Sequence, residues 1–129
     1  MRFFTRTSLL LVLLFGPAAA GLLDTVRPKI VLAQVELDDQ ANLLLEQGIE
    51  FYKINKWKEA LAKWQQALEL YIQTDNHVRQ AITLNNIGEA YRLLGSYPEA
   101  LQSYEQSLAL MQEMEDFSGE ATILSNIAI

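Results

Sequence analysis

The stretch from Asn86 to Leu101, NIGEAYRLLGSYPEAL, predicts a helix, a glycine turn and a second helix. Gly95 suits the left-handed backbone conformation of the residue that follows a helix. Ser96 and Glu99 have the S-x-x-E spacing of a capping box, and Pro98 is tolerated in a first turn because that turn has no hydrogen bond to lose. The connection is very short, so the two helices must fold back antiparallel.

A weaker copy of this stretch lies 40 residues upstream, where Gly48 corresponds to Gly88. The beginning of a third copy lies downstream, where Ala121 corresponds to Ala81. A fixed period is typical of proteins built from stacked repeats. The matched positions fall at steps of three, four and seven residues, so they share the buried face of each helix. Asn55 takes the place of Gly95 in the first copy. We therefore expect repeat units at residues 41–80 and 81–120 and an incomplete unit at residues 121–129.

Two glycines lie inside predicted helices. Glycine there costs about 0.5–1 kcal/mol relative to alanine, and the close approach of a neighbouring helix is the expected compensation. Alanines at positions 60 and 100 are small for the same reason. The large residues that fill the space beside these gaps are predicted to be Phe51, Trp64, Tyr91 and Tyr104.

The beginning of the chain predicts export from the cytoplasm. Arg2 and Arg6 precede the apolar run 9–15, which is followed by Gly16-Pro17 and three alanines. This is the pattern of a secretory signal peptide over residues 1–20, with an alternative cleavage site after Ala33. The competing interpretation is a membrane anchor over residues 8–23, although a spanning helix needs roughly 20 apolar residues. Cleavage would leave the chain in the periplasm, in the cell envelope or outside the cell.

Residues 21–38 contain Pro28 and no sustained hydrophobic period, so they are predicted to be a linker. The repeat region is expected to occupy residues 39–129. Asp38 and Asp39 supply an N-cap and favourable negative charge for a helix that begins near Gln40.

The composition excludes several classes of function. The chain has no cysteine, which excludes disulfides, thiol catalysis and cysteine-rich zinc sites. Its formal net charge is −6, and this acidity argues against binding to nucleic acid or to anionic lipid. The charges of residues 41–80 balance, whereas residues 81–120 hold Arg92 against seven acids. This asymmetry predicts either a partner with a basic or mixed face over the second unit or simply solvated helix faces.

No catalytic residue, metal site or cofactor is expected. His77 is the single histidine, so neither a two-histidine metal site nor a Ser-His-Asp triad can be assembled within one chain. It is predicted to be exposed at the start of a helix. The acids Glu113, Glu115 and Asp116 lack the spacing of a calcium-binding loop, and we interpret them as a solvated helix end.

The small and large residues of the two units resemble the tetratricopeptide repeat signature over residues 39–129. The residues that carry this resemblance are Leu44, Gly48, Phe51, Ala60, Trp64 and Ala67 in the first unit and Leu84, Gly88, Tyr91, Ala100 and Tyr104 in the second. Ser107 departs from the pattern at the position of Ala67. The usual helix-ending proline is replaced by Ile72 and Gln112, and the period is 40 residues where the commonest form has 34.

The longer period predicts longer helices. It is similar to the long-period type found in bacterial, including cyanobacterial, proteins, several of which carry a C-terminal caspase-like (CHAT) domain. A second interpretation of the chain is therefore that it is the N-terminal part of a larger protein whose effector domain is missing.

The resemblance implies an all-α, right-handed α-solenoid of antiparallel helix hairpins and a non-catalytic function. Such proteins usually bind a protein or peptide through the concave surface lined by the first helix of each pair. The residues expected to line this groove are Asn42, Leu45, Ile49, Tyr52, Lys53, Ile82, Asn85, Asn86, Glu89, Arg92, Thr122, Ser125 and Asn126.

Three asparagines of this groove can bind a ligand. The amides of Asn85, Asn86 and Asn126 offer both donors and acceptors to the backbone of a ligand. For Asn86 and Asn126, the alternative is a hydrogen bond to a neighbouring helix. Leu45 and Ile49 stand where a clamp for a C-terminal carboxylate needs cations, so a chaperone-tail adaptor is not expected. The mostly apolar residues 123–129 predict self-association with a second chain or with another segment.

Overall fold

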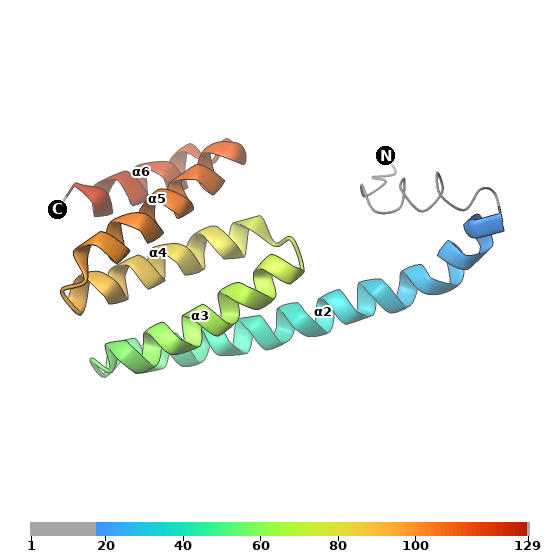
Figure 1. Ribbon diagram of the computed structural model, residues 1–129, viewed down its shortest axis with the longest axis horizontal. Helices are drawn as coiled ribbons and strands as arrows, with labels where there is room; N and C mark the ends of the chain where they lie inside the picture. The colour runs from blue at the N-terminus through green and yellow to red at the C-terminus, as the bar shows by residue number, and fades with distance from the viewer. Residues whose placement is uncertain (1–17, 129) are drawn as a thin grey trace. The chain divides into compact units, whose positions relative to one another are not determined.

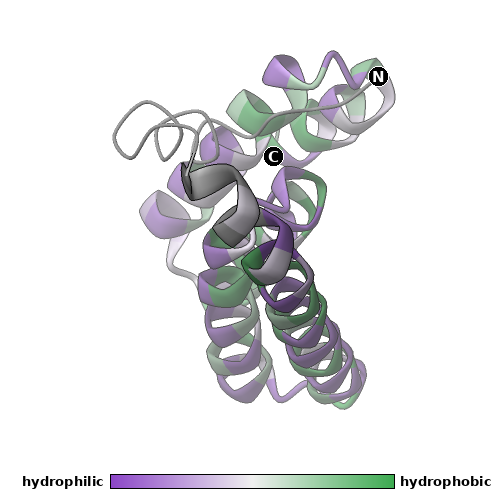
Figure 2. Cartoon of the chain, turned by 90° about the vertical axis from the view of Figure 1, so that its right-hand side faces the viewer, coloured by the Kyte–Doolittle hydropathy of each residue, from purple (hydrophilic) through white to green (hydrophobic). Residues whose placement is uncertain are grey.

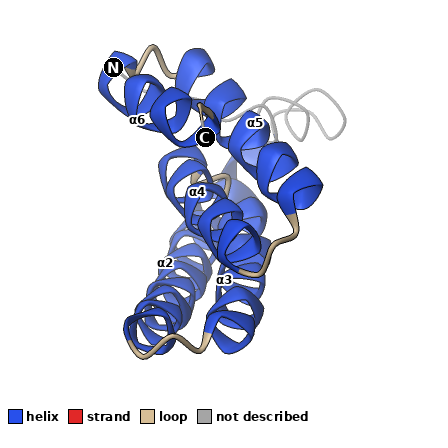
Figure 3. Cartoon of the chain, turned by 90° about the vertical axis from the view of Figure 1, so that its left-hand side faces the viewer, coloured by secondary structure: helices blue, strands red, loops and turns tan. Residues whose placement is uncertain are grey.

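The structure, a computed structural model, describes residues 18–128, and these residues form five helices and no strand. Helix α2 comprises Ala18–Lys53, α3 Trp57–Gln73, α4 His77–Leu93, α5 Tyr97–Glu113 and α6 Phe117–Ile127 (Figure 1). The chain divides between Glu36 and Leu37 into two compact units. Within residues 37–129, short loops join consecutive antiparallel helices (Figure 3). The predicted all-α solenoid of helix hairpins is confirmed.

Helix α2 begins much earlier than the sequence predicts. The segment 21–38, predicted to be a linker, is helical, and the helix passes through Pro28. Asp38 does not cap a helix near Gln40. Its carboxylate instead accepts hydrogen bonds from Thr74 Oγ1 at 2.6 Å and Asn76 Nδ2 at 3.1 Å, in the turn between α3 and α4. The predicted helix start is wrong because Asp38 finds its donors in a residue pair distant in sequence, which local spacing does not reveal.

The predicted signal segment lies almost entirely outside the described residues. Residues 24–36, which precede the repeat region, are exposed to solvent. None of the described helices is long and apolar enough to span a membrane. The cleavage sites and the alternative anchor over residues 8–23 stay predictions.

The four turns that join the helices of residues 37–129 share one backbone geometry. Asn55, Asp75 and Glu115 have φ values of 60°, 53° and 56°, and Gly95 has 77°. In each turn the following amide bonds a carbonyl five residues earlier, as Lys56 N does with Phe51 O at 3.0 Å. This is the Schellman ending of a helix, which satisfies carbonyls that the helix leaves unpaired. The predicted left-handed residues Gly95 and Asn55 are confirmed.

Replacing Glu115 by glycine should stabilise the repeat unit. A residue with a side chain pays roughly 1–2 kcal/mol to adopt the left-handed conformation. Glycine avoids this cost, but its more flexible unfolded state offsets part of the gain. We expect Glu115→Gly to raise the free energy of unfolding by about 0.5–1 kcal/mol in urea unfolding followed by circular dichroism. The same replacement at Glu105, an exposed residue inside α5, should lower it. Equal effects at both positions would contradict the assignment of the turn.

One predicted cap is not formed. Ser96 occupies the N-cap position of α5, but its side chain makes no capping hydrogen bond. The expected capping box with Glu99 is therefore wrong. The backbone supplies the contacts instead: Ser96 N donates to Tyr91 O at 2.9 Å, and Ser96 O accepts from Ala100 N at 3.0 Å. The turn is held by the Schellman bonds, so it does not need the side chain.

The helices pack large residues against glycine. A Cβ atom added to Gly88 would lie 2.6 Å from Cε1 of Tyr104, and one added to Gly48 would lie 2.8 Å from Cε2 of Trp64. Both aromatic rings are buried, with 2% of each residue exposed. The predicted close approach at these glycines is confirmed. Figure 2 shows that the helices alternate between hydrophobic and hydrophilic residues, as helices with one buried face do.

Ser107 departs from the repeat pattern for a structural reason. It is fully buried, and its hydroxyl donates a hydrogen bond of 2.6 Å to the backbone oxygen of Ala81 in α4. The alanine of the first unit, Ala67, is also fully buried. The hydroxyl thus ties α5 to α4 without leaving a buried polar group unpaired.

Candidate functional site

A cleft of about 540 Å³ opens between the first helices of the three units. Helix α2 contributes Ile49 and Tyr52, α4 contributes four residues and α6 contributes two. The second helix of the first unit adds Trp64. The full lining is Ile49, Tyr52, Trp64, Asn85, Asn86, Glu89, Arg92, Ser125 and Asn126. We call this space the concave cleft.

Most of the residues predicted to line the groove meet in this cleft. Asn42, Leu45, Lys53, Ile82 and Thr122 do not line it. Leu45 is only 5% exposed and packs in the core, so its predicted position on the groove surface is wrong. Consecutive residues of a helix point about 100° apart, and the sequence pattern does not determine the rotation of α2 about its axis closely enough to decide which of them face the groove.

Three of the other predicted residues lie outside the cleft, and two of them have partners elsewhere. Asn42 accepts a hydrogen bond of 2.6 Å from the Tyr71 hydroxyl. Lys53 forms an exposed ion pair of 2.7 Å with Glu50, one turn earlier in α2. Ile82 is exposed on α4 outside the cleft.

Glu89 is the centre of a hydrogen-bond network at the cleft. Arg92 binds its carboxylate with two donors, Nε to Oε2 at 2.8 Å and Nη2 to Oε1 at 2.5 Å. The hydroxyl of Tyr104 donates to Oε2 at 3.0 Å, and that of Tyr52 donates to Oε1 at 3.4 Å. Three helices therefore converge on one carboxylate.

This network determines the charge state of the cleft. The hydrogen bond from Arg92 is the main cause that lowers the pKa of the Glu89 carboxyl, partial burial opposes it, and Tyr104 and Tyr52 reinforce it. Burial and then Glu89 raise the pKa of Tyr104 and of Tyr52. Glu89 and Arg92 are thus a neutralised ion pair, with the carboxylate ionised and both tyrosines protonated at neutral pH. The cleft presents hydrogen-bonding groups without net charge.

The asparagines of the cleft differ in their bonding. Asn126 Nδ2 donates to Asn85 Oδ1 at 2.7 Å and so joins α6 to α4. For Asn126, the interpretation as a contact between neighbouring helices is confirmed, and Asn85 is its partner. The half-buried amide of Asn86 makes no side-chain hydrogen bond to any other residue in the described range 18–128. Asn86 therefore retains its two donors and its acceptor for a ligand.

The sequence does not reveal that two buried aromatic residues, Trp64 and Tyr104, also take part in the cleft. Trp64 and Tyr104 were predicted as packing residues, yet Trp64 also lines the cleft and Tyr104 bonds Glu89. The rings of Trp64 and Tyr52 lie with their centroids 5.8 Å apart. The indole N–H donates to Leu45 O at 3.1 Å, and only 2% of Trp64 is exposed, so the ring supports the wall of the cleft from the core. The sequence signal for such residues is a glycine inside one helix paired with an aromatic residue in the next helix, as in Gly48 with Trp64 and Gly88 with Tyr104.

The other polar residues singled out by the sequence lie at helix ends. His77 is exposed at the first residue of α4, as predicted. Glu113 ends α5, and Asp116 caps α6 by accepting a hydrogen bond of 3.0 Å from Gly119 N. Within the described residues, no group of three acidic or histidine side chains has the arrangement of a metal site.

The Glu89 network should make stability depend on acid. Because the folded-state pKa of Glu89 is lowered from 4.5, its carboxylate stabilises the fold above that value, and this contribution disappears as the pH falls through the folded pKa. Glu89→Gln should lower the free energy of unfolding by about 1–2 kcal/mol at pH 7, since hydrogen bonds to charged groups are replaced. The difference from the unmodified chain should shrink in urea unfolding at acidic pH. A difference that stays constant from neutral to acidic pH would show that the ion pair contributes nothing.

Comparison with known proteins assigns the family. The tetratricopeptide repeat family model matches residues 39–113, more than half of the chain. No curated protein and no solved structure matches the sequence. The matched range contains the paired helices and both glycine–aromatic contacts described above. The chain belongs to the tetratricopeptide repeat family.

Proposed function

We propose that the chain binds an extended or helical segment of a partner protein in the concave cleft. Tetratricopeptide repeats are generally protein-interaction modules, so a protein partner is the coarse function of the family. The observation that supports this particular site is the Asn86 amide, which faces the cleft without a partner in the described residues. It can donate to a backbone carbonyl and accept from a backbone N–H of the bound segment.

The surroundings of Asn86 favour an uncharged stretch of ligand. Glu89 and Arg92 neutralise each other, and Lys53 is paired outside the cleft. Ile49 offers apolar surface beside the amide. A segment that presents its backbone to Asn86 and an apolar side chain to Ile49 satisfies both kinds of group. The electrostatic alternative, a basic partner over the acidic second unit, requires an affinity that falls with salt.

Selection from a displayed library of short random peptides tests this proposal. Peptides that bind the unmodified chain should bind the Asn86→Ala variant about tenfold more weakly, because a loss of one backbone hydrogen bond is worth about 1.4 kcal/mol. Gln102→Ala removes an exposed amide on α5 and should leave the affinity unchanged. Selected peptides that bind both variants equally well would place the binding surface outside the cleft.

We also propose that the chain acts outside the cytoplasm. The support is the basic start, the apolar run and the small residues of positions 1–20. Fractionation of the source cells and intact mass measurement of the purified protein test this. A mature chain beginning at Gly21 in the exported fraction is the expected result, and a chain that retains Met1 in the cytoplasm would contradict it.

A further inference from the structure

Arg92 presents a masked cation to the concave cleft. Its side chain is 31% exposed, and that of its ion-pair partner Glu89 is 26% exposed. Both residues line the cleft. The hydrogen bonds from Nε and Nη2 of Arg92 to the carboxylate use two of the five N–H donors that a guanidinium carries. A ligand in the cleft therefore meets a guanidinium whose charge is already neutralised.

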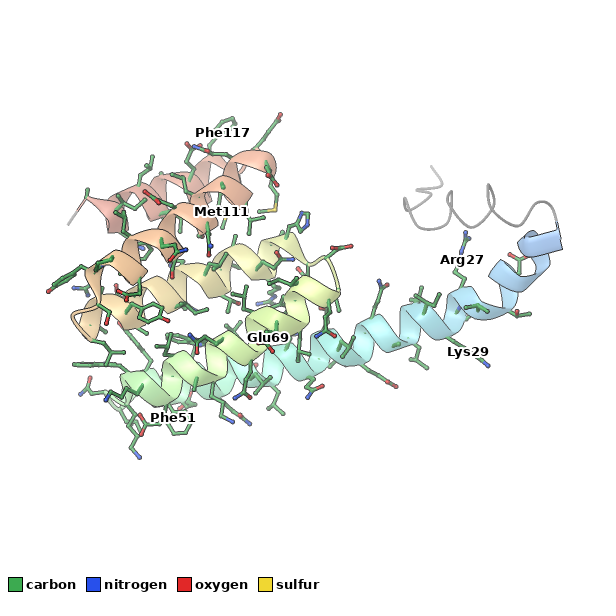
Figure 4. The ribbon with its side chains drawn as sticks, in the orientation of Figure 1. Arg27, Lys29, Phe51, Glu69, Met111 and Phe117 are labelled. Atoms are coloured by element: carbon green, nitrogen blue, oxygen red, sulfur yellow. The ribbon has the colours of Figure 1, made fainter. Side chains whose placement is uncertain are left out.

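Two other helices hold Glu89 in this position. The Tyr104 hydroxyl of α5 donates to Oε2 at 3.0 Å, and the Tyr52 hydroxyl of α2 donates to Oε1 at 3.4 Å. Side chains fill the space between the neighbouring helices of residues 37–129 (Figure 4). A carboxylate accepts about four hydrogen bonds, and Arg92 supplies the other two. Glu89 cannot turn away from Arg92 without losing its bonds to both tyrosines, so it is a fixed part of the cleft.

The first unit has uncharged residues at the same two positions. With the repeat offset of 40 residues, Ile49 corresponds to Glu89 and Tyr52 corresponds to Arg92. All four residues line the cleft. The repeat fold therefore does not require charges at these positions. The cleft stays without net charge in both units, through uncharged side chains in the first and through an ion pair in the second.

We propose that Glu89 is a specificity-determining residue, which masks Arg92 and thereby excludes ligand segments that place an acidic side chain at this point. The inference rests on the proposed binding of a partner segment in the concave cleft. Arginine binds a carboxylate through two parallel hydrogen bonds, and Glu89 already occupies the Nε and Nη2 donors of Arg92. A ligand carboxylate would have to share the guanidinium with Glu89. Two carboxylates at one site repel each other, more strongly in a half-buried cleft than in bulk water.

The remaining lining residues define the class of segment that the cleft accepts. Apart from Glu89 and Arg92, the residues that line the cleft are uncharged. Ile49 offers apolar surface, and the polar groups are the amides of Asn85, Asn86 and Asn126 and the hydroxyl of Ser125. Amides and hydroxyls both donate and accept hydrogen bonds. The fitting partner segment combines an apolar residue with uncharged polar residues such as serine, threonine, asparagine or glutamine.

Parallel selections from one displayed library of short random peptides test this role. Glu89→Gln exposes the charge of Arg92, so the selected peptides should carry more acidic residues than those selected by the unmodified chain. Their affinity should fall at least about fivefold between about 50 and about 300 mM salt, because an unmasked charge is screened by ions. Arg92→Gln leaves the carboxylate unpaired and should shift the selection toward basic residues. The double variant Glu89→Gln, Arg92→Gln should select uncharged peptides, as the unmodified chain does.

Glu105→Gln is the matched control, since it makes the same charge change at an exposed residue of α5 that does not line the cleft. It should select the same peptides as the unmodified chain. A purely structural role of Glu89 would lower stability without changing the charge of the selected peptides. The inference is overturned if Glu89→Gln does not enrich acidic residues, or if Glu105→Gln enriches them equally.

Asn86→Ala separates this result from a failure of the proposed function. Peptides that lose affinity for the Asn86→Ala chain, but whose charge does not respond to Glu89→Gln, would overturn the role of Glu89 alone. Peptides that bind every chain without regard to Asn86 would overturn binding in the cleft and, with it, the role of Glu89. Circular dichroism of each variant confirms that the selections are made on folded chains.

Discussion

Trp64→Ala should lower the free energy of unfolding by about 3–5 kcal/mol, the loss expected when a buried tryptophan is truncated. The residue is only 2% exposed, and its indole N–H donates to Leu45 O at 3.1 Å. It fills the space that Gly48 leaves and packs 5.8 Å from the Tyr52 ring. Small domains are stable by only about 5–15 kcal/mol, so the variant should populate unfolded chains even without denaturant.

The matched control for this prediction is Trp57→Ala. Trp57 is half-buried at the first residue of α3. Its removal leaves a smaller cavity, so it should cost less than half as much as the loss of Trp64. Urea unfolding followed by far-ultraviolet circular dichroism measures both variants. Equal losses would mean that Trp64 does not hold α2 and α3 together.

Gly88→Ala should also destabilise the repeat unit, by about 1–3 kcal/mol, because the added methyl overpacks the interface. The new Cβ would lie 2.6 Å from Cε1 and 2.7 Å from Cδ1 of Tyr104. The ring cannot yield freely, since its hydroxyl is bonded to Glu89. Alanine gains up to about 1 kcal/mol in helix propensity, which is less than the cost of forcing the ring aside.

Gly21→Ala provides the comparison for Gly88→Ala. Gly21 is also helical, but an added Cβ would meet nothing within 4 Å. The substitution should therefore leave the unfolding of the repeat unit unchanged. If Gly88→Ala is as stable as the unmodified chain, the close contact with Tyr104 does not determine how α4 and α5 pack.

The repeat pattern predicted those parts of the fold that depend on side-chain size at helical spacing. The glycines at 48 and 88, the aromatic residues that face them and the left-handed turn residues Asn55 and Gly95 all lie as expected. Each of these features combines a local conformational requirement with a recurring position. Repetition of the same pattern in two units is what made them recognisable.

Other features depend on contacts between distant residues, which no local pattern shows. Asp38 reads as a helix cap, but it bonds Thr74 and Asn76 of another turn. Glu115 carries no signal for its left-handed conformation, because the backbone bonds of the turn impose it. Leu45 and Ile49 are four residues apart on α2, yet one is buried in the core and the other borders the cleft.

The candidate site was predictable in its location but not in its bonding. The three first helices meet at one cleft as the repeat arrangement requires. Which amides remain available was not predictable, since Asn85 and Asn126 bond each other whereas Asn86 does not take part. Glu89 forms its ion pair with Arg92 on the same helix, but it also accepts hydrogen bonds from Tyr104 and Tyr52, which come from two different helices.

Nuclear magnetic resonance of the ¹⁵N-labelled chain, titrated with the tightest peptide from the library selection, tests the central claim most directly. The side-chain amide signals of Asn85, Asn86 and Asn126 should show the largest shifts. The exposed amides of Gln66 and Gln102, on the second helices, should not move. Shifts at those glutamines with unchanged asparagine signals would contradict binding in the concave cleft.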